Sequence, residues 1–295
     1  MKVLILGGDG TLGHQLLRTL SSRHETRVTL RGSHEHYRHA KLFDRTNAIF
    51  NIDASSMERL FEAVAAFRPD AIVNAVGIVK QRGAAKEAIA SIEINSLLPH
   101  RVALLASAVG ARFIHVSTDC VFSGARGPYT EADSPDPVDL YGRSKLLGEV
   151  VDKPHALTLR TSIVGRELSR RQGLLEWFLA QKGTARGFSK AIFSGLTTNE
   201  LSRVIETALT QHPKLNGLYH VSGDPIDKNA LLQLFARSLN PSCAIEPDES
   251  FTIDRSLVST AFRTATGYRP PSWPEMVAEL EADTDFYLHF SKQGN

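Results

Sequence analysis

Tyr141 and Lys145 stand four residues apart, a spacing that places a phenol and an ammonium group on one face of a helix, about one turn apart. An unperturbed phenol has a pKa of about 10, so it exchanges protons poorly at neutral pH. A neighbouring cation stabilises the phenolate and lowers that pKa, and one unit of lowering corresponds to about 1.4 kcal/mol. The pair can therefore pass a proton to or from a reacting oxygen. Ordinary helix surfaces often carry the same spacing, so this interpretation depends on the residues around it.

Two hydroxyl residues, Ser117 and Thr118, close a predicted strand, and Thr118 precedes Tyr141 by 23 residues. In a doubly wound sheet the carboxyl ends of the strands form the ligand crevice, so we expect these hydroxyls to point toward a cofactor. A hydroxyl there can donate to a carbonyl oxygen that becomes an alkoxide as hydride arrives. The alternative is that both hydroxyls only cap the strand. Asn95, in the helix after the strand ending at Asn74, is a candidate for holding a bent helix and a water molecule in a proton path.

A glycine-rich turn follows the first predicted strand and leads into a helix, with Gly7, Gly10 and Gly13 spaced three residues apart. Glycine permits the positive φ of a tight turn, the approach of a pyrophosphate to the backbone, and close packing of helix on sheet. The helix N-terminus offers N–H groups and a partial positive charge to the phosphates. This context predicts a dinucleotide site formed by the three glycines with Thr11 and Leu12; glycines that merely make a loop are the alternative.

The end of the second strand indicates which nicotinamide dinucleotide is bound. An acidic residue there would accept from a free ribose 2′-hydroxyl, but the sequence has Arg31, with no carboxylate expected nearby to repel a 2′-phosphate. NADPH is therefore favoured and NADH is possible. Asp53, which closes the next strand, can accept from an adenine amino group or cap a helix.

The elements that would position these residues alternate between short apolar runs and amphipathic stretches, which predicts an α/β fold with a doubly wound, Rossmann-type parallel sheet. The predicted strands are Lys2 to Leu6, Arg27 to Leu30, Ile49 to Ile52, Asp70 to Asn74, Arg112 to Ser117, Leu157 to Arg160 and Leu218 to Ser222. The predicted helices are Leu12 to Ser22, Met57 to Phe67, Ile89 to Val109, Tyr141 to Val151, Leu174 to Gln181, Asn199 to Gln211 and Glu275 to Asp283.

The rhythm changes after Arg160, where Gly183 and Gly187 are expected to break regular structure. We therefore expect a dinucleotide-binding domain over residues 1–165, with a returning segment near 198–222. A smaller substrate-binding lobe, interleaved with it, would occupy residues 166–295.

The composition of this chain of 295 residues limits the kinds of partner that it can bind. Its 34 Lys and Arg against 32 Asp and Glu give a net charge of +2, too balanced for a protein whose main partner is nucleic acid or an anionic membrane. Two cysteines, Cys120 and Cys243, cannot build a disulfide framework, and no apolar run approaches a membrane span, so we expect a cytoplasmic protein. A histidine-rich loop lacks cysteine or paired acidic ligands, so no metal is expected; its members are His24, His34, His36 and His39.

Taken together, the motifs resemble the extended short-chain dehydrogenase/reductase superfamily, and within it the dTDP-4-dehydrorhamnose reductase branch. The matching segments are Gly7-x-x-Gly10-x-x-Gly13, Asn74-Ala75-Val76-Gly77, Ser117-Thr118-Asp119, Tyr141-x-x-x-Lys145, Leu159 to Ser162, Gly195 to Thr198, Gly217 to His220 and Pro271 to Trp273. The resemblance implies reduction of the 4-keto group of a nucleoside-diphosphate 6-deoxy sugar, for polysaccharide synthesis. It implies Tyr141 as general acid, Lys145 orienting the cofactor ribose and tuning Tyr141, and Thr118 on the substrate oxygen. It also implies cofactor contacts from Ala75, Val76, Gly77, Asn95 and Ser117.

One position departs from this branch: Cys120 stands where a tyrosine is common after Ser-Thr-Asp. Asp119-Cys120 also lacks the glutamate of the related 4,6-dehydratases, which argues against dehydration. In the second lobe, arginine forks suit phosphate and aromatic rings suit stacking on a base. The substrate candidates are Thr118, Asp119, Arg160, Arg166, Arg170, Arg171, Trp177, Lys190 and Arg263, although we expect Trp177 to lie in the core.

Two other functions stay open at this point. An NAD-dependent nucleotide-sugar epimerase would hold its cofactor tightly. A regulatory subunit can keep the fold and the cofactor without turnover. The helices at Ile89 to Val109 and Tyr141 to Val151 suggest, by analogy with this superfamily, a homodimer.

Overall fold

The computed structural model describes residues 1–38, 41–79, 87–169 and 171–291. The chain forms two compact units. The first comprises Met1–Ser117, Val138–Leu159 and Ser202–Leu218, and the second comprises Thr118–Pro137, Arg160–Leu201 and Tyr219–Asn295. The helices of the described chain include none long and apolar enough to cross a membrane.

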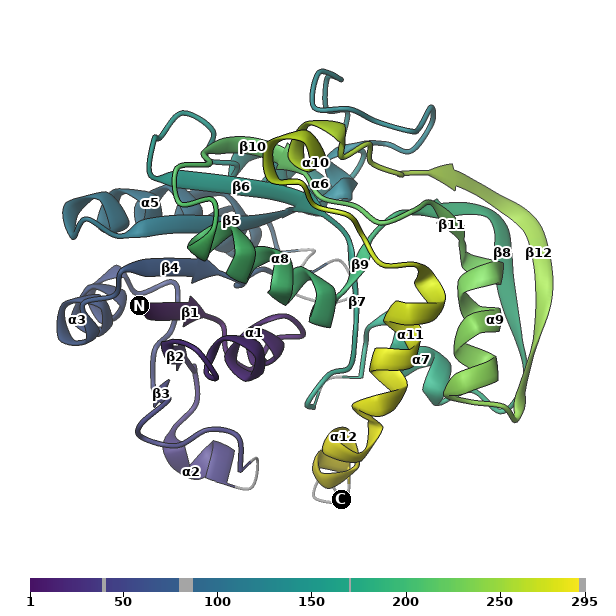
Figure 1. Cartoon of the computed structure of the whole chain (residues 1–295), viewed down its shortest axis with the longest axis horizontal. Helices are drawn as coiled ribbons and strands as arrows, with labels where there is room; N and C mark the ends of the chain where they lie inside the picture. The colour runs from purple at the N-terminus through teal and green to yellow at the C-terminus, as the bar shows by residue number, and fades with distance from the viewer. Residues whose placement is uncertain (39–40, 80–86, 170, 292–295) are drawn as a thin grey trace. The chain divides into compact units, whose positions relative to one another are not determined.

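A seven-stranded sheet forms the framework of the first unit, in the order β10-β6-β5-β4-β1-β2-β3 (Figure 1). The strands are β1 (Lys2–Leu6), β2 (Glu25–Thr29), β3 (Ala48–Ile49), β4 (Ala71–Asn74), β5 (Arg112–Thr118), β6 (Ala156–Thr161) and β10 (Gly217–His220). Strand β1 pairs in parallel with β2 and with β4, and β4 pairs in parallel with β5. The predicted α/β class with a large parallel sheet is confirmed, and the predicted returning strand is β10.

Helices follow most of these strands. They are α1 (Gly13–Leu20), α2 (His34–Tyr37), α3 (Met57–Phe67), α4 (Ala88–Ser91), α5 (Leu98–Ala108), α6 (Leu140–Leu147) and α8 (Thr198–Thr210). The helix expected over Ile89 to Val109 is interrupted between α4 and α5 by a π-helical segment, η3 (Ile92–Leu97).

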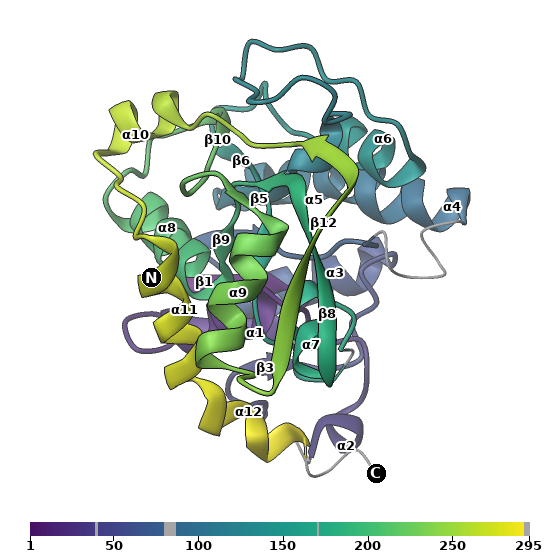
Figure 2. The ribbon, with the colours of Figure 1, turned by 90° about the vertical axis from the view of Figure 1, so that its right-hand side faces the viewer.

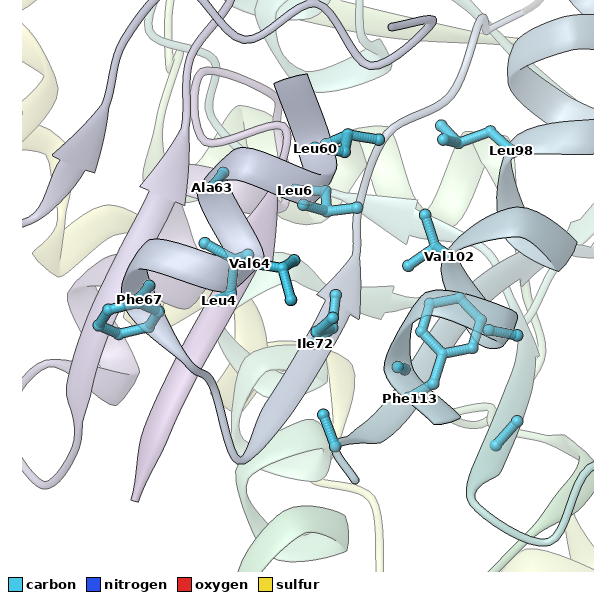
Figure 3. Packing of buried hydrophobic residues seen from close by; sticks show 14 of the residues in the cluster. Leu4, Leu6, Leu60, Ala63, Val64, Phe67, Ile72, Leu98, Val102 and Phe113 are labelled. Carbon is cyan, nitrogen blue, oxygen red and sulfur yellow. The ribbon is translucent and has the colours of Figure 1, made fainter. Parts of the chain in front are cut away.

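Apolar side chains from one face of the sheet and from two helices pack into a core in the first unit (Figure 3). Leu4 of β1, Ile72 of β4 and Phe113 of β5 are fully buried, and Phe67 of α3 and Val102 of α5 pack in the same cluster. Each such side chain contributes about 1.5–3 kcal/mol relative to an exposed position. This core holds the carboxyl ends of β1, β4 and β5 in fixed register.

The second unit contains a three-stranded sheet in the order β11-β8-β12. Its elements, with the smaller ones around it, are η4 (Asp119–Val121), β7 (Ile163–Val164), α7 (Leu174–Leu179), β8 (Gly183–Phe193), β9 (Leu196–Thr197), β11 (Ile226–Asp227), α9 (Lys228–Ser238), β12 (Cys243–Asp254), α10 (Thr260–Thr266), α11 (Trp273–Ala282) and α12 (Thr284–Ser291). Helix α9 lies alongside β8 and β12 (Figure 2).

The expectation that Gly183 and Gly187 break regular structure is wrong, because both lie within β8. Gly187 faces α9 so closely that a Cβ atom there would stand 2.6 Å from the Cα atom of Asn229. A glycine inside a strand often marks such a close approach of another backbone.

Candidate active site

The turn between β1 and α1 has the geometry that its glycines predict. Gly7 has a φ of +85°, in the region that favours glycine, and a Cβ atom on Gly13 would stand 2.0 Å from the carbonyl oxygen of Gly7. At Gly10 the same oxygen would be 3.2 Å away. Leu12, the N-cap of α1, offers no side-chain acceptor to the first-turn N–H groups. The helix start beside Thr11 therefore presents backbone donors of the kind that bind phosphate.

Arg31 is exposed just beyond β2, where the sequence places a residue that can meet a 2′-phosphate. Asp53 accepts from the backbone N–H of Ser55 at 2.9 Å and from its hydroxyl at 2.8 Å. These bonds lower the pKa of Asp53, and the charge of Arg31 lowers it further. The expectation that no carboxylate lies near Arg31 is therefore wrong. Asp53 forms a local turn with Ser55, and the helix cap that was its alternative is wrong, because the N-cap of α3 is Ser56. Its contact with adenine stays a prediction.

Lys145 is fully enclosed in the first unit, with 4% of its surface exposed. Its Nζ donates to the backbone carbonyl of Val116 in β5 at 2.7 Å and lies 3.4 Å from Nε2 of His115. Burial lowers the pKa of Lys145 to about 8, and the carboxylate of Glu149 acts in the opposite direction. The lysine that sequence reasoning selected is thus anchored on the strand that ends at Ser117.

Tyr141 is half-buried in the first turn of α6, one turn before Lys145. That turn begins where the side chain of Asp139 accepts from the N–H of Gly142 at 2.8 Å. The carbonyl oxygen of Tyr141 accepts from the hydroxyl of Ser144 at 3.0 Å. The capped helix therefore places the phenol and the ammonium on neighbouring turns.

Ser117 makes a contact within the first unit that the sequence did not predict. Its hydroxyl donates to Oε1 of Glu149 at 2.7 Å, so the hydroxyl proton is bonded to the segment that follows α6. The hydroxyl therefore braces β5 against the segment after α6, and a cofactor contact by Ser117 stays a prediction.

Asn95 joins three segments of the first unit from within the π-helical segment η3. Its side chain accepts from the N–H of Ile78 at 2.9 Å and donates to the carbonyl of Ile78 at 3.0 Å and to Ser144 at 3.1 Å. The irregular helix that was expected at this residue is present. These bonds hold the chain after β4 beside α6; Ala75 and Gly77, predicted to contact cofactor, lie in that stretch.

His115 is a site residue that the sequence reasoning missed. It is fully buried in β5, and its Nδ1 lies 3.2 Å from Nδ2 of Asn74 at the end of β4. Burial and the neighbouring Lys145 hold the pKa of His115 well below its usual value, so the imidazole is neutral at pH 7. The available signal was a histidine in an otherwise apolar strand, two residues before Ser117.

In the second unit, Thr118 has an extended backbone and caps the short helix η4. Its hydroxyl donates to Oδ1 of Asp119 at 3.2 Å and accepts from the N–H of Cys120 at 3.1 Å. Burial raises the pKa of Asp119 and raises that of the Cys120 thiol to about 12. Two residues that sequence reasoning missed approach η4: Arg255, whose Nη1 lies 3.5 Å from Sγ of Cys120, and Lys228, whose charge acts on both side chains.

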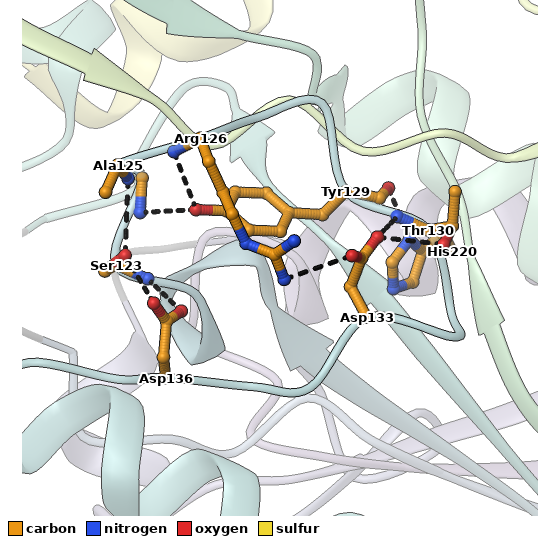
Figure 4. Close-up of polar contacts among 9 residues, drawn as sticks. Ser123, Ala125, Arg126, Tyr129, Thr130, Asp133, Asp136 and His220 are labelled. Carbon is orange, nitrogen blue, oxygen red and sulfur yellow. Dashed lines mark hydrogen bonds and ion pairs between the residues drawn. The ribbon is translucent and has the colours of Figure 1, made fainter.

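A closed loop over residues 123–136 follows η4 (Figure 4). The hydroxyl of Tyr129 accepts from the N–H of Gly124 at 3.1 Å, and the carboxylate of Asp136 accepts from the backbone and side chain of Ser123. The Tyr129 ring stacks on Phe122, with centroids 4.1 Å apart. These contacts fix the backbone that leads away from Thr118.

The basic substrate candidates of the second unit make contacts of several kinds. Arg160 is buried against the ring of Phe122 and 3.3 Å from Nε2 of His220. Arg166 pairs with the buried Glu176 at 2.7 Å. Arg263 donates to the hydroxyl of Ser259 at 2.9 Å and to the carbonyl of Ser222 at 3.2 Å, and Lys190 pairs with Glu249 at 2.7 Å. Arg171 is exposed, and Arg170 lies outside the described residues.

Trp177 was expected in the core, but 41% of its surface is exposed on α7. Its helix buries Leu175 and Phe178 instead, so the indole is on the outer face. Substrate contact by Trp177 stays a prediction. As for metals, His, Cys, Asp and Glu residues form no group of three able to hold an ion in the part of the chain that the structure describes.

Comparison with known proteins identifies the family. SpsK, a spore coat polysaccharide biosynthesis protein of Bacillus subtilis, is 30% identical over 231 residues, which cover 76% of this chain and 74% of that protein. The dTDP-4-dehydrorhamnose reductase of Escherichia coli is 30% identical over 232 residues, which cover 75% and 72%. The β subunit of methionine adenosyltransferase 2 of Bos taurus is 25% identical over 269 residues, which cover 83% and 75%.

Among solved structures, dTDP-4-dehydrorhamnose reductase from Bacillus anthracis in complex with NADP has a TM-score of 0.78 at 21% identity, with 96% of this chain and 99% of that chain covered. This likeness confirms the fold. Residues 1–283 match the family model described as the RmlD substrate binding domain. The chain therefore belongs to the RmlD substrate binding domain family, as its motifs predicted.

Proposed function

We propose that this protein is an NADPH-dependent reductase of the 4-keto group of a nucleoside-diphosphate 4-keto-6-deoxy sugar, acting in polysaccharide synthesis. The observation that carries the proposal is the placement of Lys145, buried and bonded to the backbone of β5, one helical turn from Tyr141. The family and the names of the relatives from Bacillus subtilis and Escherichia coli support the substrate class. NADH remains a possible alternative cofactor.

Three residues carry the chemistry in this proposal. NADPH, when bound, supplies a hydride to the keto carbon. Tyr141 gives its phenolic proton to the keto oxygen, so the products are the sugar alcohol and NADP⁺. The cation of Lys145 stabilises the phenolate that remains, and the same ammonium orients the cofactor ribose. The hydroxyl of Thr118, which donates to Asp119 in the structure, would turn from that bond to donate to the oxygen as negative charge develops on it.

The first unit fits the cofactor. The β1–α1 turn brings Gly10 and Gly13 close to the backbone of Gly7, and none of these three residues adds a side chain between its backbone and a pyrophosphate. Arg31 is exposed where a 2′-phosphate would lie. We therefore assign cofactor binding to the first unit, and substrate binding to the second, with Asp119, Arg160, Trp177 and Arg263 as substrate contacts. A cytoplasmic location and a homodimer belong to the same proposal.

A second candidate function has its own support. A relative that is 25% identical to this chain is named as the β subunit of methionine adenosyltransferase 2, which supports a role as a subunit of another enzyme. In that case the protein would bind NADPH without oxidising it.

The test is to mix the protein with NADPH and a panel of dTDP-, UDP- and GDP-linked 4-keto-6-deoxy sugars and follow nicotinamide absorbance. We expect oxidation with at least one sugar and a loss of about 10²–10⁴-fold in kcat for Tyr141→Phe. Tyr219→Phe, the same change at a half-buried tyrosine of β10, is the matched control. NADPH binding without oxidation across the panel would support the regulatory subunit, and tightly co-purifying NAD would support an epimerase.

A further inference from the structure

A chain of hydrogen bonds runs inside the first unit from the loop after β4 to Lys145. The N–H of Val76 donates to Oδ1 of Asn74 at 3.1 Å, which fixes the orientation of that amide. Nδ2 of Asn74 then lies 3.2 Å from Nδ1 of His115, and Nε2 of His115 lies 3.4 Å from Nζ of Lys145. Lys145 ends the chain by donating to the carbonyl of Val116 at 2.7 Å.

The direction of these bonds is set at the Val76 end. A backbone N–H can only donate, so Oδ1 of Asn74 must accept and Nδ2 must be the donor toward His115. A neutral imidazole has one acceptor nitrogen and one N–H. Because Nδ1 accepts from Asn74, the proton of His115 resides on Nε2, where it points at Lys145.

That arrangement discriminates between the two forms of Lys145. A neutral amine at Nζ can accept from Nε2–H of His115 and still donate to the carbonyl of Val116. An ammonium presents a donor to a donor at 3.4 Å. His115 is fully buried and neutral, so it cannot relieve this conflict by taking solvent as a partner.

We propose that Asn74 and His115 are positioning residues that favour the neutral amine of Lys145 through the direction of this bond chain, linking the cofactor-binding loop at Val76 to the charge beside Tyr141. The inference rests on the proposed role of Lys145 toward Tyr141, because the bond chain lowers the proton affinity of the same amine whose cation would stabilise the phenolate. The other titratable groups that act here are Glu149, which favours the charged lysine, and His100, which acts on His115. The two neighbours of Val116 in β5 therefore act in opposite directions. His115 faces Lys145 and favours its neutral amine, whereas Ser117 is bonded to Glu149, which favours the charged form.

The first experiment reads the tautomer of His115 directly and needs no turnover. Protein with ¹⁵N-labelled histidine is examined by NMR from pH 6 to 10, and His115 is assigned from the signal missing in His115→Gln. We expect a neutral imidazole with its proton on Nε2 at pH 8 and above. A proton on Nδ1 at pH 9, or an imidazolium at pH 7, would overturn the proposal.

The second experiment reverses the chain. Asn74→Asp replaces the donor with a carboxylate that accepts from Nδ1–H, which turns Nε2 into an acceptor for the ammonium. We expect the ¹⁵N signals to show the Nδ1–H tautomer, and the pH midpoint of NADPH binding and of kcat/KM to rise by about one unit, a tenfold gain in the proton affinity of Lys145. Asn216→Asp adds the same charge at an exposed position of the first unit and should move neither midpoint. Equal behaviour of the two variants would overturn the proposal.

These readouts separate the inference from the proposed function. The tautomer and the NADPH-binding midpoint are measured without any sugar. If no sugar of the panel is reduced but His115 carries its proton on Nε2, the bond chain stands and the substrate assignment fails. If sugars are reduced but His115 carries its proton on Nδ1, the substrate assignment stands and the bond chain fails.

Discussion

Lys145 shows at the scale of one residue how a buried group proposed for catalysis lowers the free energy of unfolding. It is 4% exposed, and burial lowers its pKa from 10.5 to about 8. Below pH 8 the lysine is charged in both the folded and the unfolded chain, and the folded state bears the cost of removing that charge from water. Between about pH 8 and 10.5 the unfolded lysine holds more protons than the folded one, so the free energy of unfolding rises with pH.

We therefore predict that Lys145→Met removes a rise of about 3 kcal/mol in the free energy of unfolding between pH 7 and pH 10.5. The variant should also be inactive and more stable than the natural protein at pH 7. Urea unfolding at several pH values measures both effects. Other groups titrate in the same range, so the quantity compared is the difference in slope between the two proteins. Parallel curves would show that the charge of Lys145 is well solvated in the folded state.

The sequence could propose Tyr141 and Lys145 as site residues because the chemistry proposed for them depends on spacing along one element. Tyr141 and Lys145 share a single helix, so a separation of four residues determined their relation. His115 acts across strands, through Asn74 on β4 and Lys145 on α6, and nothing in its own sequence neighbourhood records those partners. Arg255 escaped notice for the same reason, since its contact with Cys120 joins positions 135 residues apart.

At the scale of elements, the sequence predicted best where an apolar pattern and a capping or turn signal agree. β1 begins and ends at Lys2–Leu6 and α3 at Met57–Phe67, as predicted. The long strands β8 and β12 were missed because glycines and charged residues dilute their alternation. They are stabilised by pairing with each other and by α9, which are tertiary contacts. The π-helical segment around Asn95 likewise depends on bonds to Ile78 and Ser144.

The β1–α1 turn allows a prediction with an internal control. A methyl group on Gly13 would stand 2.0 Å from a backbone oxygen that cannot move independently, whereas one on Gly10 would stand 3.2 Å from the same oxygen. We expect Gly13→Ala to lower the affinity for NADPH by about 100-fold or more. The turn must open to admit the methyl group, and its backbone N–H groups then no longer point at the pyrophosphate. Gly10→Ala should keep the melting temperature and weaken binding less. Fluorescence titration with NADPH and thermal unfolding check both; equal effects of the two variants would contradict this account of the turn.

At the scale of the whole molecule, the balanced charge of +2 is compatible with an anionic cofactor because cations are placed locally. Arg31 is exposed beyond β2, and the backbone donors at α1 add to it. Composition thus excludes a broad basic surface but carries no information about a local anion site. The same distinction applies to apolar surface, which average hydropathy does not reveal.

Exposed apolar side chains gather on the helices proposed to form a dimer. Ile89 is 77% exposed, Leu104 64% and Leu147 65%, and His100 of α5 bonds the carbonyl of Leu147 at 2.8 Å, which joins the helices. Exposed apolar side chains concentrated on neighbouring helices are typical of an interface between proteins. A stable interface would bury about 800 Å² on each copy, which needs both helices.

We predict that the natural protein sediments as a dimer and that the double variant Leu104→Glu, Leu147→Glu sediments as a monomer, because two carboxylates in each copy would have to be buried without partners. Phe61→Glu is the control: Phe61 is 58% exposed on α3, a helix that is not part of the proposed interface, and its change should leave the dimer intact. Sedimentation velocity at micromolar concentration measures the mass of each species. The monomeric variant should keep its NADPH affinity, since the glycine turn and Lys145 belong to one unit of one copy. A natural protein that sediments as a monomer would show that these apolar side chains serve another contact.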